Sequence, residues 1–320
     1  MKAVAHTFTD IELPKPTPAG RDLLVKVEAI SVNPVDYKQR KTATSSKVLG
    51  WDAAGTVEAV GKDVTLFKRG DAVYYAGDVT RPGANSEFHL VDERIVGRKP
   101  KKLGFAQAAA MPLTSITAWE AFYDRMHVVP GKSMLIIGGA GGVGSIGIQL
   151  AKSSNLRVIA TASRPETTAW VKSLGADHVV DHRKELRPQL EALGLKQVDY
   201  IANFSGELDA YWSAMADLIA PQGAMVAIVG NVKPMAMDVV RSKSATICWE
   251  LMFTRPRFQT PDMIEQHRLL DEVADRLDAG KLKCTLKETL SPINGANLRK
   301  AHERLESGTM IGKLVLKGWA

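Results

Sequence analysis

The 320-residue chain contains few cysteines and few aromatic residues. Its two cysteines, Cys248 and Cys284, are too few for a disulfide framework or for a zinc site of four thiolates. Aromatic residues make up 6% of the chain, whereas 26 residues are glycine, so tight turns and close backbone approaches are expected. With 45% apolar and 24% charged residues, the composition is that of a globular protein. The length predicts two domains, and we expect a reduced, cytoplasmic protein.

The chain also lacks a long apolar run free of glycine. Its first ten residues contain no apolar segment of the length that a signal peptide needs. Nineteen uncharged residues separate Lys132 from Lys152, which approaches the length of a membrane span. Six of them are glycines, clustered mainly over residues 138–144, so this segment favours a turn and no membrane association is expected.

The net charge of +7 permits binding of nucleic acid or of a phosphorylated ligand. The basic residues are scattered, and the densest run, over residues 98–102, has no interleaved aromatic residues. We interpret this run as a solvated loop between two elements, with a nucleic-acid patch as the less favoured alternative.

Two regions of different texture follow each other along the chain. Up to about residue 110, strand-like segments over 23–30, 55–60 and 72–75 are separated by turns, which predicts an irregular, mostly antiparallel β-domain. From about residue 116, strands and helices alternate, which is typical of a doubly wound parallel sheet. We therefore predict an α/β protein with one domain over 1–117 and 256–320 and a dinucleotide-binding domain over 118–255.

Within the second region, the apolar patterns predict a regular series of elements. The strands are expected over 133–137, 157–161, 176–180, 198–202, 224–229 and 245–249, and the helices over 142–153, 165–174 and 208–219. The tail predicts a helix over 263–279 and a last strand over 311–316 that returns to the first domain. Right-handed crossovers place the carboxyl ends of the parallel strands along one crevice.

A Gly-x-Gly-x-x-Gly motif begins at Gly139. The motif alone is weak evidence, but here a buried strand precedes it and a helix follows it. Gly139 permits the tight turn, Gly141 lets backbone amides approach a pyrophosphate, and Gly144 lets helix and strand pack closely. The first residues of the helix, Gly142 and Val143, then offer unpaired N–H groups to the phosphates.

The residues after the second strand decide between NADH and NADPH. An acidic side chain about twenty residues after the motif would bind a ribose 2′-OH. This chain instead has Ser163 and Arg164, a hydroxyl and a guanidinium that suit a 2′-phosphate. Glu166 lies in the first turn of the next helix, where it complements the helix dipole. We therefore predict NADPH as the cofactor.

Taken in order, the motifs resemble those of the medium-chain dehydrogenase/reductase superfamily and, within it, of the zinc-free quinone oxidoreductase branch. Besides the glycine turn, the resemblance rests on residues 31–36 (Ser-Val-Asn-Pro-Val-Asp), 49–55, 109–119 and 312–316. The stretch 249–255 is similar to a bacterial group labelled "zinc-type alcohol dehydrogenase-like". The resemblance covers nearly the whole chain and implies a GroES-like catalytic domain beside a Rossmann domain.

The zinc label can be tested on the residues. Zinc-dependent relatives carry a catalytic Cys where this chain has Asn33, a His where it has Trp51, and a third ligand near residues 113–114. None of these can supply a thiolate or an imidazole, and residues 77–91 contain none of the four cysteines of a structural zinc lobe. We therefore expect no bound metal.

The absence of zinc ligands narrows the expected substrates. Without a Lewis acid nothing strongly polarises a simple carbonyl, whereas a quinone or enone spreads the developing charge onto its own oxygen. The resemblance implies NADPH-dependent reduction of quinones or α,β-unsaturated carbonyls. An alcohol or aldehyde dehydrogenase of the same superfamily is the first alternative. A non-catalytic NADPH-binding sensor or a nucleic-acid-binding protein is the second.

The motif over residues 31–36 supplies the catalytic candidates. Asn33 is expected either to donate a hydrogen bond to substrate or nicotinamide or to cap the loop. Asp36 is the weaker catalytic candidate, because it more readily orders the loop. Tyr37 is the nearest phenol, although no protein proton donor is identified. Trp51 and Phe253 either line the substrate pocket or fill the core.

The remaining expected cofactor contacts follow the strands. By resemblance, Thr117 contacts the nicotinamide end, and two groups at strand ends face the crevice: Asn203, Phe204 and Ser205, and Val229, Gly230 and Asn231. Edge strands near 224–229 and 245–249 can pair across a two-fold axis, so we expect a homodimer.

Overall fold

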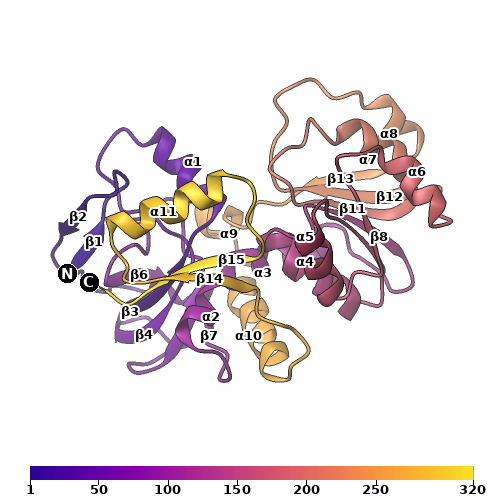
Figure 1. Ribbon diagram of the computed structural model, residues 1–320. Coiled ribbons are helices and arrows are strands. Elements are labelled where there is room, and N and C mark those ends of the chain that lie inside the picture. Colours follow the sequence, from indigo (N-terminus) through magenta and orange to yellow (C-terminus); the bar gives the residue numbers. More distant parts are fainter. Residues whose placement is uncertain (320) are drawn as a thin grey trace. The chain divides into compact units, whose positions relative to one another are not determined.

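The computed structural model describes residues 1–319 and divides into two compact units (Figure 1). The first unit comprises Met1–Ile116 and Phe253–Ala320, and the second comprises Thr117–Met252. The expected boundaries at residues 117 and 255 differ from these at Thr117, which falls in the second unit, and at residues 253–255, which fall in the first. The predicted fold class is confirmed, because one unit holds a parallel sheet and the other a separate, mostly antiparallel one. Within residues 1–319, no helix is both long and apolar enough to cross a membrane.

The first unit is built on a sheet with the strand order β14-β15-β3-β4-β5-β7, and β6 also pairs with β3. Its strands are β3 (Asp22–Ser31), β4 (Ala53–Val60), β5 (Ala72–Tyr75), β6 (Phe88–Asp92), β7 (Val96–Arg98), β14 (Leu286–Leu290) and β15 (Lys313–Lys317), and β1 (Lys2–Val4) and β2 (Asp10–Glu12) form a separate antiparallel pair. The last strand returns to this unit as predicted, because β15 pairs antiparallel with β3. Buried aliphatic side chains from β3, β4 and β15 form its core.

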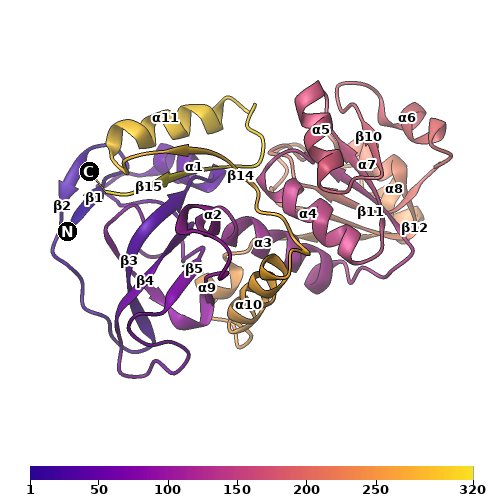
Figure 2. The ribbon, with the colours of Figure 1, turned by 60° about the horizontal axis from the view of Figure 1, so that its bottom comes forward.

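Short helices surround this sheet. They are α1 (Pro34–Thr42), the 3₁₀ helix η1 (Glu93–Ile95), α2 (Phe105–Ala109), the first part of α3 (Pro112–Trp119), which belongs to the second unit from Thr117 on, α9 (Thr254–Phe258), α10 (Glu265–Asp278) and α11 (Gly295–Glu306). Helix α11 runs beside α1 and β15 (Figures 1 and 2). Strand β14 and helix α11 are elements of the tail that the sequence patterns did not predict.

Helix α1 corrects the expectation of an active-site loop over residues 31–36. Asn33 has extended backbone angles and forms the N-cap, and Pro34 occupies the first turn, where its missing N–H costs nothing. The backbone N–H of Asn33 donates to Oδ2 of Asp36 at 2.8 Å, which is one half of a capping box. The segment is therefore a strand end joined directly to a helix.

The second unit contains a six-stranded sheet with the order β10-β9-β8-β11-β12-β13, in which every pairing is parallel. Its strands are β8 (Ser133–Ile137), β9 (Arg157–Thr161), β10 (His178–Val180), β11 (Val198–Asn203), β12 (Ile219–Ala227) and β13 (Thr246–Trp249). Its helices are the π-helix η2 (Glu120–Arg125), α4 (Gly142–Ser153), α5 (Pro165–Ser173), α6 (Leu186–Ala192), α7 (Trp212–Leu218) and α8 (Asp238–Ser242). Helices α4 and α5 cover one face of this sheet, and α7 and α8 the other (Figures 1 and 2).

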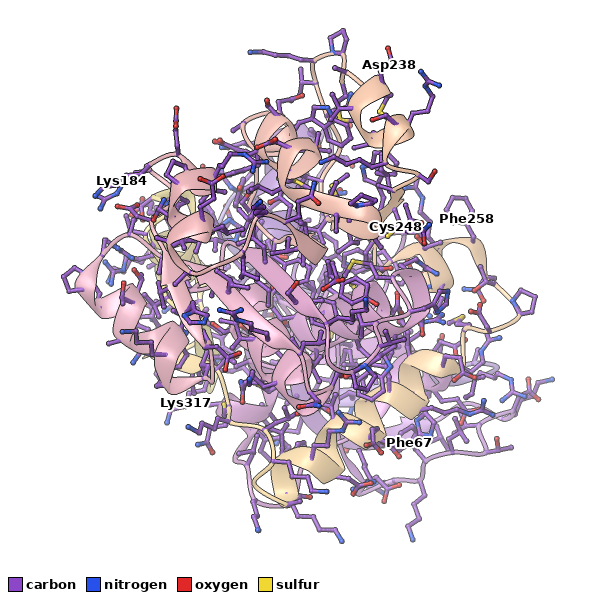
Figure 3. The ribbon with its side chains drawn as sticks, turned by 90° about the vertical axis from the view of Figure 1, so that its right-hand side faces the viewer. Phe67, Lys184, Asp238, Cys248, Phe258 and Lys317 are labelled. Carbon is purple, nitrogen blue, oxygen red and sulfur yellow. The ribbon has the colours of Figure 1, made fainter. Side chains whose placement is uncertain are left out.

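The strand order corrects one part of the dimer prediction. Strand β12 lies between β11 and β13 and pairs with both, so residues 224–229 do not form a sheet edge. Strand β13 is the edge next to it, and Trp249 at its end is 46% exposed. Figure 3 labels Cys248 on this strand.

Candidate functional site

The turn between β8 and α4 contains the glycine motif. Gly138 has a φ of +79°, which strains any residue with a side chain, and its N–H donates to Oγ1 of Thr161 at 3.0 Å. Gly141 is the N-cap of α4 and has extended backbone angles. The next strand thus supports the turn, and the first N–H groups of α4 lie just beyond Gly141.

A Cβ atom added to each glycine of the motif separates their roles. At Gly144 it would lie 2.2 Å from the carbonyl oxygen of Gly138, and at Gly139 it would lie 3.0 Å from Cβ of Ala160. Protein packing therefore requires a glycine at 144, whereas at 139 a side chain would force its neighbours to move by a few tenths of an ångström. At Gly141 the nearest atom is the Gly138 oxygen at 3.5 Å, which is an ordinary contact. Packing does not require a glycine at 141, although glycine also suits the N-cap position, and a pyrophosphate close to the backbone favours one, so the turn fits a nicotinamide dinucleotide.

Two arginines flank Ser163 after β9. Arg164 is the N-cap of α5, and its Nε lies 3.1 Å from Oε1 of Glu166. Arg183, in the loop after β10, donates from Nη2 to the carbonyl of Ser163 and pairs with Asp181 at 3.2 Å. Each guanidinium therefore has a carboxylate beside it, and Glu166 contacts Arg164 as well as standing in the first turn of α5.

The residues at the end of β11 bond mainly to one another. Oδ1 of buried Asn203 accepts from the N–H of Ser205 at 3.0 Å and from its Oγ at 2.6 Å. Phe204 is buried and its ring stacks on Phe122 with centroids 5.7 Å apart. A Cβ on Gly147 of α4 would lie 2.8 Å from this ring, so Phe204 packs tightly on the helix that begins at the glycine turn.

The group at residues 229–231 lies beyond the end of its strand. Strand β12 ends at Ala227, so Val229 is not a strand residue; it is half-buried and packs on the core of the second unit. Gly230 and Asn231 are exposed, and Nδ2 of Asn231 donates to the carbonyl of Lys233 at 2.9 Å.

The parallel sheet gathers the expected cofactor residues of the second unit. The glycine turn and the groups at 163–164, 203–205 and 229–231 each follow the carboxyl end of a strand, so they share one edge of the sheet. Thr117 is buried in α3 and is the first residue of the same unit. The structure does not place it at a strand end.

The side chain of Asn33 in the first unit is hydrogen-bonded through both its nitrogen and its oxygen. Its Nδ2 donates to Oδ2 of Asp52 at 2.8 Å and to the carbonyl of Ser31 at 3.3 Å, and its Oδ1 accepts from Nζ of Lys313. Donation from Asn33 to a substrate would require one of these bonds to break. The side chain of Asn33 makes no capping hydrogen bond to α1; it holds Ser31, Asp52 and Lys313 instead.

Asp36 is 1% exposed. Its Oδ2 accepts from the N–H of Asn33, and among residues 1–319 its Oδ1 has no hydrogen-bond partner. Loss of water raises the pKa of this carboxyl to about 7, against the opposing effects of the Asn33 N–H and the Lys313 charge. A buried carboxyl that exchanges a proton near neutral pH is a suitable group for a functional site.

The three residues expected in the substrate pocket differ in their burial. Trp51 is 1% exposed, its Nε1 donates to the carbonyl of Asp78 at 3.1 Å, and its ring meets that of Phe253 edge to face at 6.4 Å. The burial of both rings favours their role in filling the core. Tyr37 is half-buried on α1 and lies beside Nζ of Lys41, 5.1 Å from the ring centroid.

Comparisons with known proteins found matches to both parts of the chain. The family model of the alcohol dehydrogenase GroES-like domain matches residues 19–119, and that of a zinc-binding dehydrogenase matches residues 174–316. Over 97% of its length, the chain is 44% identical to a zinc-type alcohol dehydrogenase-like protein of Staphylococcus aureus, 95% of which is covered. The chain belongs to the medium-chain dehydrogenase/reductase superfamily.

Two further matches indicate the branch of this superfamily. The chain is 32% identical to a 2-methylene-furan-3-one reductase of Solanum lycopersicum, over 92% of this chain and 71% of the relative. Its structure is similar to that of the Escherichia coli quinone oxidoreductase complexed with NADPH, with a TM-score of 0.84 and 26% identity over 97% of this chain and 95% of the other. This medium-chain dehydrogenase/reductase is an oxidoreductase of the zinc-free quinone oxidoreductase branch, as the motifs predicted.

Zinc, which the names of one family model and one relative imply, does not fit the residues of this medium-chain dehydrogenase/reductase. At the three expected ligand positions, Asn33 and Trp51 are bonded to protein groups, and residues 113–114 are Leu and Thr. Nowhere in residues 1–319 do three or more His, Cys, Asp or Glu side chains gather in a way that could hold a metal ion. The donor set therefore disagrees with the label.

Sequence reasoning missed four residues of these sites. Thr161, at the end of β9, binds the N–H of Gly138, and Arg183, in the loop after β10, binds the carbonyl of Ser163. Asp52 and Lys313 bind the side chain of Asn33. Asp52 and Lys313 both lie within the motifs of the resemblance, but they are 261 positions apart, so nothing in the sequence pairs them.

Proposed function

We propose that this protein is an NADPH-dependent, metal-independent oxidoreductase that reduces quinones or α,β-unsaturated carbonyls. The observation that carries the proposal is the glycine turn, where packing leaves room for a side chain at Gly141 and a pyrophosphate close to the backbone would not. Bound NADPH would supply a hydride, and a proton from water completes the two-electron reduction of the acceptor.

The residues of the second unit would hold the cofactor. The N–H groups of Gly142 and Val143 at the start of α4 would bind the pyrophosphate, with the partial positive charge of the helix in support. Ser163 and Arg164 would bind the 2′-phosphate, which supports NADPH over NADH because a carboxylate at this place would repel it. For Arg164 this means exchanging or sharing its contact with Glu166.

The substrate class rests on what the first unit offers. The expected zinc positions hold no thiolate or imidazole, so the protein has no strong Lewis acid for a simple carbonyl. A conjugated acceptor needs only modest hydrogen bonding, because its charge spreads as the hydride arrives. The relatives' names, a furanone reductase and a quinone oxidoreductase, agree with this class.

The test is turnover by the purified protein. NADPH oxidation is followed with benzoquinones, naphthoquinones, enones, and saturated aldehydes and ketones as acceptors, with and without a chelator, and then with NADH in place of NADPH. We expect chelator-resistant reduction of the quinones or enones and a higher kcat/KM with NADPH than with NADH.

The other outcomes identify the alternatives. Chelator-sensitive turnover of aldehydes or alcohols would support the alcohol dehydrogenase alternative and overturn the proposal. Tight NADPH binding with no turnover of any acceptor would support a sensor. The basic run over 98–102 gives a nucleic-acid role less support than its charge suggests, because Arg98 pairs with Asp275 at 2.6 Å and with Asp271 at 3.5 Å, and Lys99 donates to the carbonyl of Pro100 at 2.7 Å.

A further inference from the structure

A buried ion pair in the first unit lies beside the segment 31–36. Lys313 begins β15 and its side chain is 3% exposed, and Asp52, just before β4, is fully buried. Nζ of Lys313 donates to Oδ2 of Asp52 at 3.0 Å, to the carbonyl of Val32 at 3.0 Å and to Oδ1 of Asn33. These three bonds use all three N–H groups of the ammonium.

The carboxylate of Asp52 is equally well satisfied. Its Oδ1 accepts from the N–H of Leu113 at 2.8 Å, and its Oδ2 accepts from Nδ2 of Asn33 at 2.8 Å and from Lys313. The pair therefore joins the starts of α1, α3, β4 and β15. A buried ion pair adds little net stability compared with apolar residues of similar volume. Its complete set of hydrogen bonds instead selects one arrangement of the four segments.

That arrangement fixes the start of α1. With its side chain held by Asp52 and Lys313, Asn33 presents its backbone N–H to Oδ2 of Asp36. The other oxygen of Asp36 is buried and has no partner in the described part of the chain. Most buried polar atoms have a hydrogen-bond partner. An oxygen without one, at a candidate site residue, is suited to carry the proton of the carboxyl group or to bind a group of the ligand.

We propose that Lys313 and Asp52 are positioning residues of the reductase reaction, which act through Asn33 and control both the position and the protonation of Asp36. The inference rests on the proposed function. It adds to that function two residues that act on a catalytic candidate without being expected to touch the substrate themselves.

The charges around Asp36 predict how its pKa changes when either residue of the ion pair is replaced. Desolvation is the largest effect on this carboxyl, and the charge of Lys313 lowers its pKa whereas that of Asp52 raises it. Helix α11 packs on α1 and contributes two further titratable groups. Its Glu306 pairs with basic residues of α1, and burial lowers the pKa of its His302 to about 4, so that this histidine is neutral near pH 7. Removal of Lys313 and removal of Asp52 should therefore move the pKa of Asp36 in opposite directions.

The experiment compares Lys313→Met and Asp52→Asn with Lys317→Met. Lys317 stands at the exposed end of the same strand and is labelled in Figure 3. The pH dependence of kcat/KM is measured for each. We expect an inflection of the wild type near pH 7 to rise by about 1 pH unit in Lys313→Met and to fall by a smaller amount in Asp52→Asn, because the charge of Lys313 has the larger effect on Asp36. In Lys313→Met, kcat should fall by about tenfold with little change in KM for NADPH.

A second readout does not depend on turnover. The infrared band of the protonated Asp36 carboxyl, identified by its absence in Asp36→Asn, is titrated in all variants. If no acceptor is reduced, the proposed function fails, and opposite shifts of this band would still support control of Asp36 by the ion pair. If Lys313→Met does not fold, Lys313→Arg should leave the titration nearly unchanged because the charge remains, and Asp52→Asn supplies the shift. Folded variants whose titrations are unchanged, or shift in the same direction, would overturn the inference, as would a matching shift in Lys317→Met.

Discussion

Replacing two glycines of the same turn by alanine should separate a structural role from a ligand-binding role. In Gly144→Ala, the new Cβ would lie 2.2 Å from the Gly138 oxygen and 2.7 Å from Cα of Gly139, so backbone must move. Overpacking of this kind costs about 3 kcal/mol, at the upper end of the usual range. For a unit of this size, that loss lowers the Tm by roughly 6–12 °C.

Gly141→Ala should have the opposite profile. Its Cβ meets only an ordinary contact at 3.5 Å, so the main cost is the weaker N-cap, about 1 kcal/mol, and the Tm should fall by only a few degrees. The methyl group would lie where we expect the pyrophosphate, so the Kd for NADPH should rise at least about tenfold, equal to about 1.4 kcal/mol.

Thermal unfolding by circular dichroism and calorimetric titration with NADPH measure the two effects. A Gly141→Ala protein that binds NADPH as tightly as the wild type would refute our interpretation of the turn. A Gly144→Ala protein with an unchanged Tm would show that the turn relaxes freely, and the packing argument would then be wrong.

Three further predictions concern other parts of the molecule. Arg164→Ala should raise the KM for NADPH by about tenfold and leave NADH kinetics nearly unchanged, whereas Glu166→Gln, which removes the carboxylate charge beside Arg164, should lower the KM for NADPH; equal effects on both cofactors would contradict this. Burial lowers the pKa of His89 to about 4, so between pH 6.5 and 4 only the unfolded chain gains a proton at this residue. The free energy of unfolding should therefore fall by about 3 kcal/mol over this pH range. Urea unfolding of the wild type and of His89→Gln tests this, and an equal pH dependence in both would count against it. If β13 pairs with its copy in a homodimer, Trp249→Lys should halve the mass seen by light scattering, and a monomeric wild type would remove the proposal.

Much of the second unit could be predicted because its elements are local patterns, although helices α6 and α8 were not predicted. The expected segments 133–137, 142–153 and 157–161 coincide with β8, α4 and β9. Each is a continuous apolar run or a single apolar stripe bounded by a turn. The strand at 224–229 was predicted less well, because β12 begins at Ile219 and ends at Ala227, and no local signal marks those limits.

The first unit depended more on distant partners. Helix α1 begins at the proline of the pair Asn33-Pro34, and such a pair is as typical of a turn as of a helix start. Helix α11 has few apolar residues and is capped by the Asn294 side chain, and β14 is a half-exposed strand that gains its place by pairing with β15. The expected site residues stay predictions, although the structure explains why Asn33 is better suited to hold its neighbours than to reach a substrate.

The position of β15 has a consequence for the order in which the two units can fold during synthesis. This strand lies inside the sheet, between β14 and β3, so the first unit lacks an interior strand until residues 313–317 have left the ribosome. All residues of the second unit are translated earlier and can fold as a unit during synthesis. Nascent chains stalled before residue 313 should therefore expose the partner edge of β3, and chaperones that recognise unpaired strands would find it there.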